Sequence, residues 1–214
     1  MENETNLSLS GHVGICITDA DLVVRSWDDW LAKHTRISGQ DARGRPLTDL
    51  IPDIERRGLL DRFRRVVEQR VVEVLSPALH RYLIPCPPVR PSPHYEHMQQ
   101  RVVIAPLREG ERVVGVMVTI QDVTERRDLE QDLNSSDERV RLHAARALAQ
   151  AETEGSADPL VRALNDQSWR VRRAAVHGLA RNASAQAVEA LLLALQQEHH
   201  SPSVLNSALA LRAS

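Results

Sequence analysis

The chain has 214 residues, of which 42% are apolar and 26% are charged, so it is a globular protein with room for one large domain or two small ones. Its formal net charge of −2 gives no overall field towards polyanions, and we expect neither nucleic acid nor a membrane as a partner. Two cysteines make no disulfide framework, and no signal peptide or membrane-length apolar run occurs, so the expected location is cytoplasmic.

The first half of the chain alternates between strand and helix patterns. Residues 13–18 and 22–27 are short β-branched runs around an Asp-Ala-Asp turn, which predicts a β-hairpin. Short helical segments are expected at 28–34 and 48–54, separated by Gly and Pro. A longer helix is predicted over residues 55–69, because its apolar residues recur at helical spacing with arginines on the opposite face.

Three further strands are predicted at residues 81–85, 101–106 and 112–121, the last two joined by a tight polar turn. The prolines between positions 85 and 93 exclude a strand there, so residues 85–100 form a long loop. Because long ordered loops are often functional, we expect a partner-contact surface in it. Two strands, several helices and three strands indicate an α+β domain with an antiparallel five-stranded sheet.

The second half has no strand pattern and is rich in alanine. Its apolar pattern at 140–149 recurs at 171–180, a constant offset (171 − 140 = 31). A second helix is expected after each copy, at 159–164 and 187–195, and a third copy starts at Pro202. Helix pairs repeated at such a period form an α-solenoid, since one pair alone cannot bury its apolar face.

Two motifs frame the first half. The opening hairpin leads into Trp27-Asp28-Asp29-Trp30, and the last strand leads into Asp122-Val-Thr-Glu-Arg. Asp122 and Thr124 are good N-cap residues and Glu125 suits the first turn of a helix, so the strand is expected to continue directly into a helix. In both motifs the first half resembles the PAS domain family over residues 10–126. The resemblance implies that the closing motif (Asp122, Thr124, Glu125 and Arg126) relays a signal to an output module.

The PAS resemblance also implies a cavity between the long helix and the sheet, where a small ligand would bind. Val103 and Ile104 are neighbours on one strand, so only one of them can face that cavity. The same residues would equally fill an ordinary core, and a ligand-free dimerisation domain stays open. The candidate wall residues are Phe63, Val67, Leu83, Val103, Ile104, Val116 and Val118.

Haem is the one cofactor for which ligand residues are available, and the cofactor stays unknown. Imidazole or thiolate could bind iron from the candidate ligands His80, His94, His97 and Cys86. Exposed or hydrogen-bonded loop histidines are the alternative reading, and Cys16 is expected in the core. A light-sensing flavin is disfavoured, because the PAS type that binds it carries a cysteine in the region that here spans 39–50, which has none. No metal site is expected.

The repeats carry their own motif, Asp137-x-x-Val-Arg-x-x-Ala-Ala-x-Ala-Leu148. It resembles the HEAT-like repeats also found in phycobilin lyases, which implies a surface for a protein partner on the concave face of the solenoid. The arginines could instead form a basic stripe for phosphates, although Val-Arg is part of the repeat pattern itself. They are Arg139, Arg141, Arg170, Arg172 and Arg173.

These patterns predict a flexible N-terminus (1–10), a PAS sensor domain (11–122), a linker helix (123–135) and HEAT-like repeats (136–214). The expected function is sensing a ligand, redox state or partner and relaying it through the linker helix. No catalytic motif is found, so we expect no enzyme in these residues and an output domain beyond them, a diguanylate cyclase or a histidine kinase. A homodimer through the PAS domain and linker helix is expected. A dimerising protein-binding scaffold and a haem-based gas sensor are the alternatives.

Overall fold

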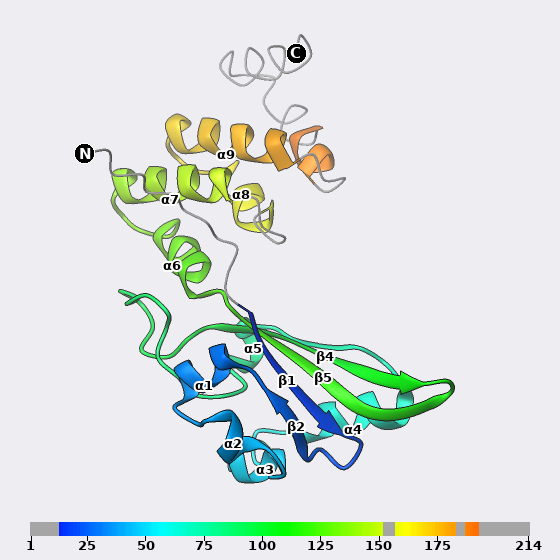
Figure 1. Ribbon diagram of the computed structural model, residues 1–214. Coiled ribbons are helices and arrows are strands. Elements are labelled where there is room, and N and C mark those ends of the chain that lie inside the picture. The colour runs from blue at the N-terminus through cyan, green and yellow to red at the C-terminus, as the bar shows by residue number, and fades with distance from the viewer. Residues whose placement is uncertain (1–12, 152–156, 183–186, 193–214) are drawn as a thin grey trace, which may run out of the picture. The chain divides into compact units, whose positions relative to one another are not determined.

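The computed structural model describes residues 13–151, 157–182 and 187–192 (Figure 1). The chain divides into two compact units, with the division between Glu125 and Arg126. We refer to residues 13–125 as the α+β unit and to the described residues from 126 onwards as the helical unit.

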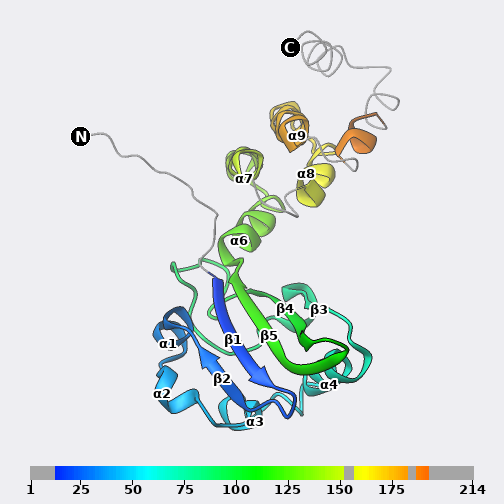
Figure 2. The same cartoon turned by 45° about the vertical axis from the view of Figure 1, so that its right-hand side comes forward.

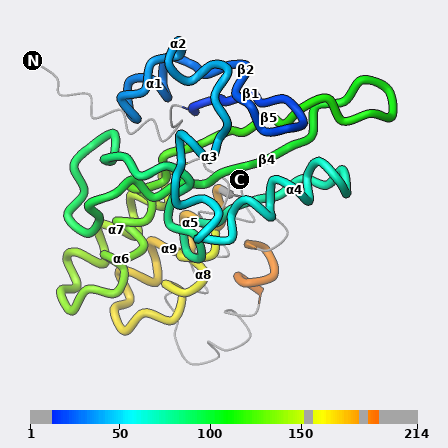
Figure 3. The backbone as a smooth tube through the Cα atoms, turned by 90° about the horizontal axis from the view of Figure 1, so that it is seen from below, coloured from blue at the N-terminus to red at the C-terminus, as the bar shows by residue number. Residues whose placement is uncertain are grey.

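The α+β unit is built on a five-stranded antiparallel sheet in the order β2-β1-β5-β4-β3. This confirms the predicted fold class, including the hairpin formed by the first two strands. The β4–β5 turn extends beyond the end of β1 (Figure 3), and the three strands lie side by side in Figure 2. The strands are β1 (Val13–Asp19), β2 (Val24–Trp27), β3 (Glu73–Leu75), β4 (Gln100–Glu109) and β5 (Arg112–Asp122).

One face of the sheet forms the core because every second side chain points the same way. The registers place Cys16 opposite Val118, and Val118 opposite Ile104, so these three buried side chains form a row across the sheet. Facing this row is Phe63, which is completely buried. On the opposite face Val13 and Ile15 are 42% and 39% exposed.

Five helices accompany the sheet, and Figure 1 shows α1, α2 and α3 gathered beside its β1–β2 edge. α4 contacts β4 and β5 and buries Leu60, Phe63 and Val66, which share one helical face. The helices are α1 (Asp29–Thr35), α2 (Gly39–Ala42), α3 (Leu47–Leu50), α4 (Leu60–Gln69) and α5 (Pro77–His80).

The long helix α4 is shorter than the sequence pattern predicts, since it begins at Leu60 rather than at residue 55. Gly58 has a φ of +67°, a left-handed conformation that ends any helix, and the amide of Leu59 donates to the carbonyl of Ile54. Residues 52–58 therefore form turns. The second short helix likewise spans only α3 instead of 48–54.

The predicted strand at 81–85 is wrong, and the strand at that edge of the sheet is β3. Leu83 and Ile84 are both buried, so this segment lacks the alternation of a half-buried strand. The carbonyl of Arg81 accepts from the Gln100 amide of β4 (2.9 Å), but the other backbone bonds described for this segment go mainly to two side chains. Gln100 accepts from the amides of Leu83 (2.8 Å) and Ile84 (3.2 Å), and Arg57 donates to the carbonyls of His80 and Leu83.

The helical unit repeats a helix pair, as the 31-residue offset predicts. Residues 187–192 are helical and follow α9 as α8 follows α7. No helix of the described part is long and apolar enough to cross a membrane. The predictions for residues 1–10, for 193–195 and for the copy starting at Pro202 lie outside the described residues. The helices are α6 (Thr124–Asp132), α7 (Glu138–Gln150), α8 (Ala157–Ala163) and α9 (Trp169–Asn182).

The Val-Arg pair of each repeat has a structural use. Arg141 donates to the carbonyls of Ser135 and Ser136, and Arg172 to those of Asp166 and Gln167, so each arginine holds the turn before its own helix. Arg141 also forms a two-bond pair with the Asp166 carboxylate (2.9 and 3.2 Å). Burial acts to raise the pKa of Asp166, but the bonds from Arg141 and from the Ser168 amide outweigh it and lower that pKa.

Gly178 sets how closely α7 and α9 approach. A Cβ at this position would lie 2.6 Å from the Cβ of Ala149 and 2.7 Å from Cδ1 of Leu160. Both distances are too short for carbon atoms, so any larger residue separates the helices. Glycine is therefore required here, although it costs about 1 kcal/mol of helix propensity relative to alanine.

We predict that Gly178→Ala destabilises the helical unit in spite of the better helix propensity of alanine. Overpacking costs about 1–3 kcal/mol, which exceeds the propensity gain. Far-UV circular dichroism during urea unfolding measures the difference. His177→Ala, at the exposed neighbouring position, is the matched control and should unfold like the wild type. A Gly178→Ala protein at least as stable as the wild type would contradict the close approach.

Candidate functional site

The carboxylate of Asp122, at the end of β5, connects the long loop to the start of α6. Its Oδ2 accepts from the amide of Val89 in the loop (2.9 Å), and its Oδ1 accepts from the amide of Thr124 (2.8 Å). Asp122 therefore caps the helix, as its position in the closing motif predicts. The same side chain also fixes a loop residue that lies 33 positions earlier in the chain.

Thr124 has a different role from the predicted helix cap. Its hydroxyl donates to Asp122 Oδ1 and accepts from the amide of Gln99 (2.9 Å), at the last loop position before β4. The carbonyl of Gln99 accepts from the amide of Val123 (2.8 Å). Thr124 is only 2% exposed, so these bonds are shielded from water. The loop end and the helix start are thus joined by several direct bonds.

The other two charged residues of the motif, Glu125 and Arg126, lie on the first turn of α6. Glu125 forms an ion pair with Arg90 of the loop at 3.7 Å, with both side chains partly exposed. Arg126 pairs with Glu130 one turn further along the helix at 3.4 Å. The Arg90–Glu125 pair is exposed and contributes little free energy, and the Arg126–Glu130 pair lies within α6, so the Asp122 and Thr124 bonds dominate the junction between the loop and the helix.

Gln100 holds the other end of the loop against the core. It is 1% exposed, and besides accepting from Leu83 and Ile84 its amide donates to the Ile84 carbonyl (2.7 Å) and to the Cys86 sulfur (3.3 Å). The carbonyl of Cys86 accepts from the amide of Met98 (2.8 Å), which closes the loop on itself. Residues 86–99 are therefore attached to the core at one end and to α6 at the other.

Of the seven predicted cavity residues, the structure brings six together. Phe63, Leu83, Ile104, Val116 and Val118 belong to one buried cluster, and Val67 packs against it. Val103 does not, because it alternates with Ile104 and lies half-buried on the opposite face of β4. The sequence left open which of these two neighbours faces the core, and in the structure it is Ile104.

The same cluster contains a polar group that sequence reasoning did not assign to the cavity. The indole N–H of Trp27 is buried in this cluster and finds no acceptor among the described residues, and Trp27 is 5% exposed. An unsatisfied buried donor costs about 1–3 kcal/mol. Trp27 belongs to the opening motif, but no sequence pattern indicates that its N–H lacks a partner.

The candidate haem ligands do not form one site. His97 stacks on the Tyr82 ring (5.3 Å between centroids) and His94 lies edge-on to Tyr95 (6.4 Å). The pKa of His80 is lowered by burial and by nearby Arg62 and Arg57. Within the described ranges no group of three or more His, Cys, Asp or Glu side chains is suited to a metal ion.

Both thiols are buried and engaged in packing. Burial, with a smaller effect of the Asp122 charge, raises the pKa of Cys86 to about 11. The hydrogen bond from Gln100 acts in the opposite direction but is the weaker effect. Burial, with a smaller effect of Asp28, raises the pKa of Cys16 to about 12. A thiolate is the form that binds iron, so these values oppose Cys86 as a haem ligand.

Comparison with known proteins assigns both units. A model described as the PAS fold matches residues 10–128, and a model of HEAT repeats matches 127–212. The chain therefore belongs to the PAS family, and HEAT repeats follow its PAS domain, in the order that the sequence motifs indicate. Whether the repeats are of the phycobilin-lyase type stays a prediction. A comparison with curated proteins gave no significant match.

Several solved structures are similar to the PAS part. A sensory box sensor histidine kinase from Vibrio cholerae is 18% identical, with 53% of this chain and 82% of that chain covered and a TM-score of 0.43. The PAS domain of the histidine kinase ThkA is 20% identical, with 52% and 100% covered and a TM-score of 0.38. A PAS domain from Colwellia psychrerythraea is 16% identical, with 53% and 87% covered and a TM-score of 0.39.

We predict that Asp122→Ala lowers the free energy of unfolding of the PAS domain by about 1–2 kcal/mol, since it removes a helix cap and leaves the Val89 amide without its acceptor. Urea unfolding followed by the fluorescence of Trp27 and Trp30, in a Trp169→Phe background, isolates this domain. Asp49→Ala, at an exposed position of α3, is the control. Equal stability of the two variants would contradict the bridging role of Asp122.

The raised pKa values predict that neither native thiol reacts readily with a disulfide reagent at about pH 8, where an unfolded cysteine is partly ionised. The reaction rate should rise as the pH approaches the pKa of about 11 of Cys86. Absorbance assays with the native protein and with protein in denaturant supply the comparison. A thiol that is modified at once in the native protein would contradict the buried state of that cysteine.

Proposed function

We propose that this chain is a cytoplasmic sensory and signal-transduction protein. Its PAS domain responds to a small ligand and passes the response through α6 to the HEAT repeats. The observation that supports a ligand is the N–H of Trp27, which is buried in the same cluster as Phe63 and has no acceptor among the described residues. A ligand acceptor bonded to this N–H would remove its desolvation cost, so a bound molecule with a carbonyl, carboxylate or ether oxygen is favoured.

The relay follows the contacts of the loop. A ligand beside Leu83 moves a residue whose amide is held by Gln100, and the loop then leads to Asp122 and Thr124 at the start of α6. Further along α6, Leu129 is buried in the apolar cluster of the helical unit. For the ligand to drive a change, it must bind one arrangement of these contacts better than another.

A redox stimulus is less favoured than a small molecule. Both cysteines are free and buried, and their high pKa values keep them as thiols at neutral pH. Haem is a weaker alternative, because His80, His94, His97 and Cys86 form separate contacts. We assign no catalytic step to these residues; the reaction that the signal controls belongs to a separate module, such as a histidine kinase or a diguanylate cyclase.

The second candidate function is a dimerising scaffold, and the outer face of the sheet favours it. Val13, Ile15 and Val74 are 42%, 39% and 51% exposed on this face. Burying such side chains against a second copy would stabilise a dimer. The linker helix offers less, because Leu129 and Leu133 already pack within the helical unit. We therefore propose that any homodimer uses mainly the PAS sheet.

Native mass spectrometry of gently purified full-length protein tests the ligand. The expected result is a folded protein carrying an extra small-molecule mass that is lost on denaturation. Trp27→Phe, which keeps an aromatic ring but removes the N–H, should lower the affinity for that molecule about tenfold, the effect of one hydrogen bond of ordinary strength. Trp169→Phe, in the helical unit, should leave the affinity unchanged.

A dimer without any bound molecule, together with no stabilising compound in a thermal-shift screen of small carboxylates and ketones, would contradict the ligand sensor and support the scaffold. Equal affinity of Trp27→Phe and wild type would contradict the role given to Trp27. A Soret absorption band in the purified protein would instead support haem.

A further inference from the structure

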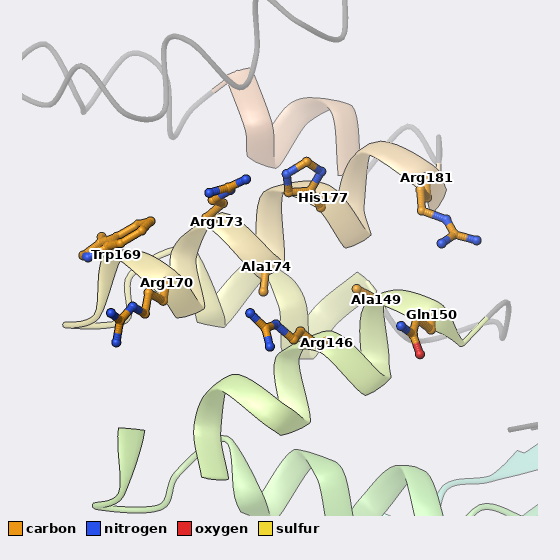
Figure 4. Close-up of a pocket in the computed structure, with 9 residues that line it drawn as sticks. All are labelled: Arg146, Ala149, Gln150, Trp169, Arg170, Arg173, Ala174, His177 and Arg181. Carbon is orange, nitrogen blue, oxygen red and sulfur yellow. The ribbon is translucent and has the colours of Figure 1, made fainter. Parts of the chain in front are cut away.

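A groove of about 480 Å³ lies between α7 and α9 on the surface of the helical unit (Figure 4). Its lining is strongly basic, and among the residues that the structure describes no carboxylate belongs to it. Figure 4 shows these side chains along the two helices and the apolar Ala149 and Ala174 between them. The basic side chains of the lining are Arg146, Arg170, Arg173, His177 and Arg181.

Most of these arginines form no ion pair within the described part of the chain. Within the described ranges, Arg146, Arg173 and Arg181 are exposed and take part in no ion pair. Arg170 is the exception, because it pairs with Glu138 at 3.6 Å and lies 5.6 Å from the Trp169 ring centroid. Glu138 also accepts from the hydroxyl of Ser168 (2.8 Å). The field of the groove is therefore largely uncompensated.

The stability of α9 does not explain this arrangement. The helix contains no Asp or Glu, and Arg170 and Arg173 lie near its N-terminus, where the helix dipole disfavours positive charge. The repeat pattern does not explain it either, because the patterned arginines Arg141 and Arg172 are the ones that hold the turns. The groove arginines are additional to the pattern.

Trp169 adds an apolar contact at one end of the groove. It is 50% exposed, although tryptophan side chains are on average largely buried in folded proteins. Tryptophan and arginine are the residues most enriched where protein partners bind tightly. Arginine also forms two parallel hydrogen bonds with a carboxylate, which gives directional recognition.

We propose that this groove binds an acidic segment of a partner protein, with carboxylates on Arg146, Arg173 and Arg181 and an apolar side chain on Trp169. The distance from Trp169 to Arg181 along α9 is about 18 Å at 1.5 Å per residue. An extended segment of about six residues spans that length. This deepens the protein-binding role that the repeat motif implies and rests on it.

The charge distribution favours an acidic protein segment over nucleic acid. The chain as a whole carries a net charge of −2, so no overall positive field attracts a polyanion. A nucleic acid would extend beyond the groove, along phosphates that need a longer basic surface. A short acidic segment can bind within the length of the groove.

Fluorescence anisotropy with full-length protein tests the proposal. The probe is a fluorescein-labelled Glu-Asp-Leu-Glu-Asp-Glu peptide at about 50 mM salt, where surface charges are weakly screened. The double variant Arg146→Gln/Arg173→Gln should raise Kd about tenfold or more, since each lost charge-assisted bond changes affinity by about that factor. The matched control is Arg162→Gln, an exposed arginine of α8 outside the groove, which should bind like wild type.

A second peptide and a third protein variant test which features of the bound segment the groove recognises. The peptide with Gln and Asn in place of Glu and Asp should not bind, and Trp169→Ala should weaken only peptides that contain the leucine. No binding of the acidic peptide by wild type, or equal binding by the double variant with unchanged circular dichroism, overturns the proposal. Tighter binding of a dodecamer of thymidylate than of the peptide, lost in the double variant, also overturns it, in favour of nucleic acid.

The outcome is separable from the test of the sensor. Ligand retention depends on Trp27 in the PAS domain, and peptide binding depends on arginines of α7 and α9. A protein that retains its ligand but ignores the peptide keeps the sensor proposal and overturns the groove. A protein that binds the peptide through Arg146 and Arg173 without retaining a ligand supports the groove and contradicts the ligand sensor.

Discussion

The Asp122 carboxylate is the constraint on which the functional architecture depends. Two oxygens of one side chain serve two segments: the long loop through Val89 and the start of α6 through Thr124. A second bond, from the Gln99 amide at the end of the loop to the Thr124 hydroxyl, joins the same two segments. The bond from the Gln99 amide to Thr124 is buried and the bond from the Val89 amide to Asp122 is exposed, and together they join the loop to the start of α6.

The helical unit is built around a different constraint, the close approach of α7 and α9 at Gly178. The patterned arginines Arg141 and Arg172 fix the turns. The arginines that line the groove are not needed for that purpose. Leu129 on α6 is buried with the repeat helices, so the helix that begins at Thr124 ends inside the apolar cluster of the repeats. The part of α6 that contains Leu129 and the basic groove thus belong to one folded unit.

The sequence predicted most of the fold because the main patterns are local. β1, β4 and β5 follow from alternating β-branched residues, and the repeats follow from the 31-residue offset. β3 escaped detection because three residues are too short to show a period, and 81–85 was misread because Gln100 and Arg57 satisfy its backbone from distant positions. The site divides in the same way: Asp122 and Thr124 carry a local motif, whereas their bonds to Val89 and Gln99, and the missing acceptor of Trp27, exist only in the folded chain.

The central claim is that the core communicates with α6 through the loop, and hydrogen exchange of Leu83→Ala tests it most directly. The substitution loosens the loop at its core end while leaving the backbone bond to Gln100 available. At times when β1 and β5 stay protected, the account predicts faster exchange in residues 86–99 and in 124–132, with α9 unchanged. Faster exchange confined to the residues beside Leu83, with α6 as protected as in the wild type, would contradict it.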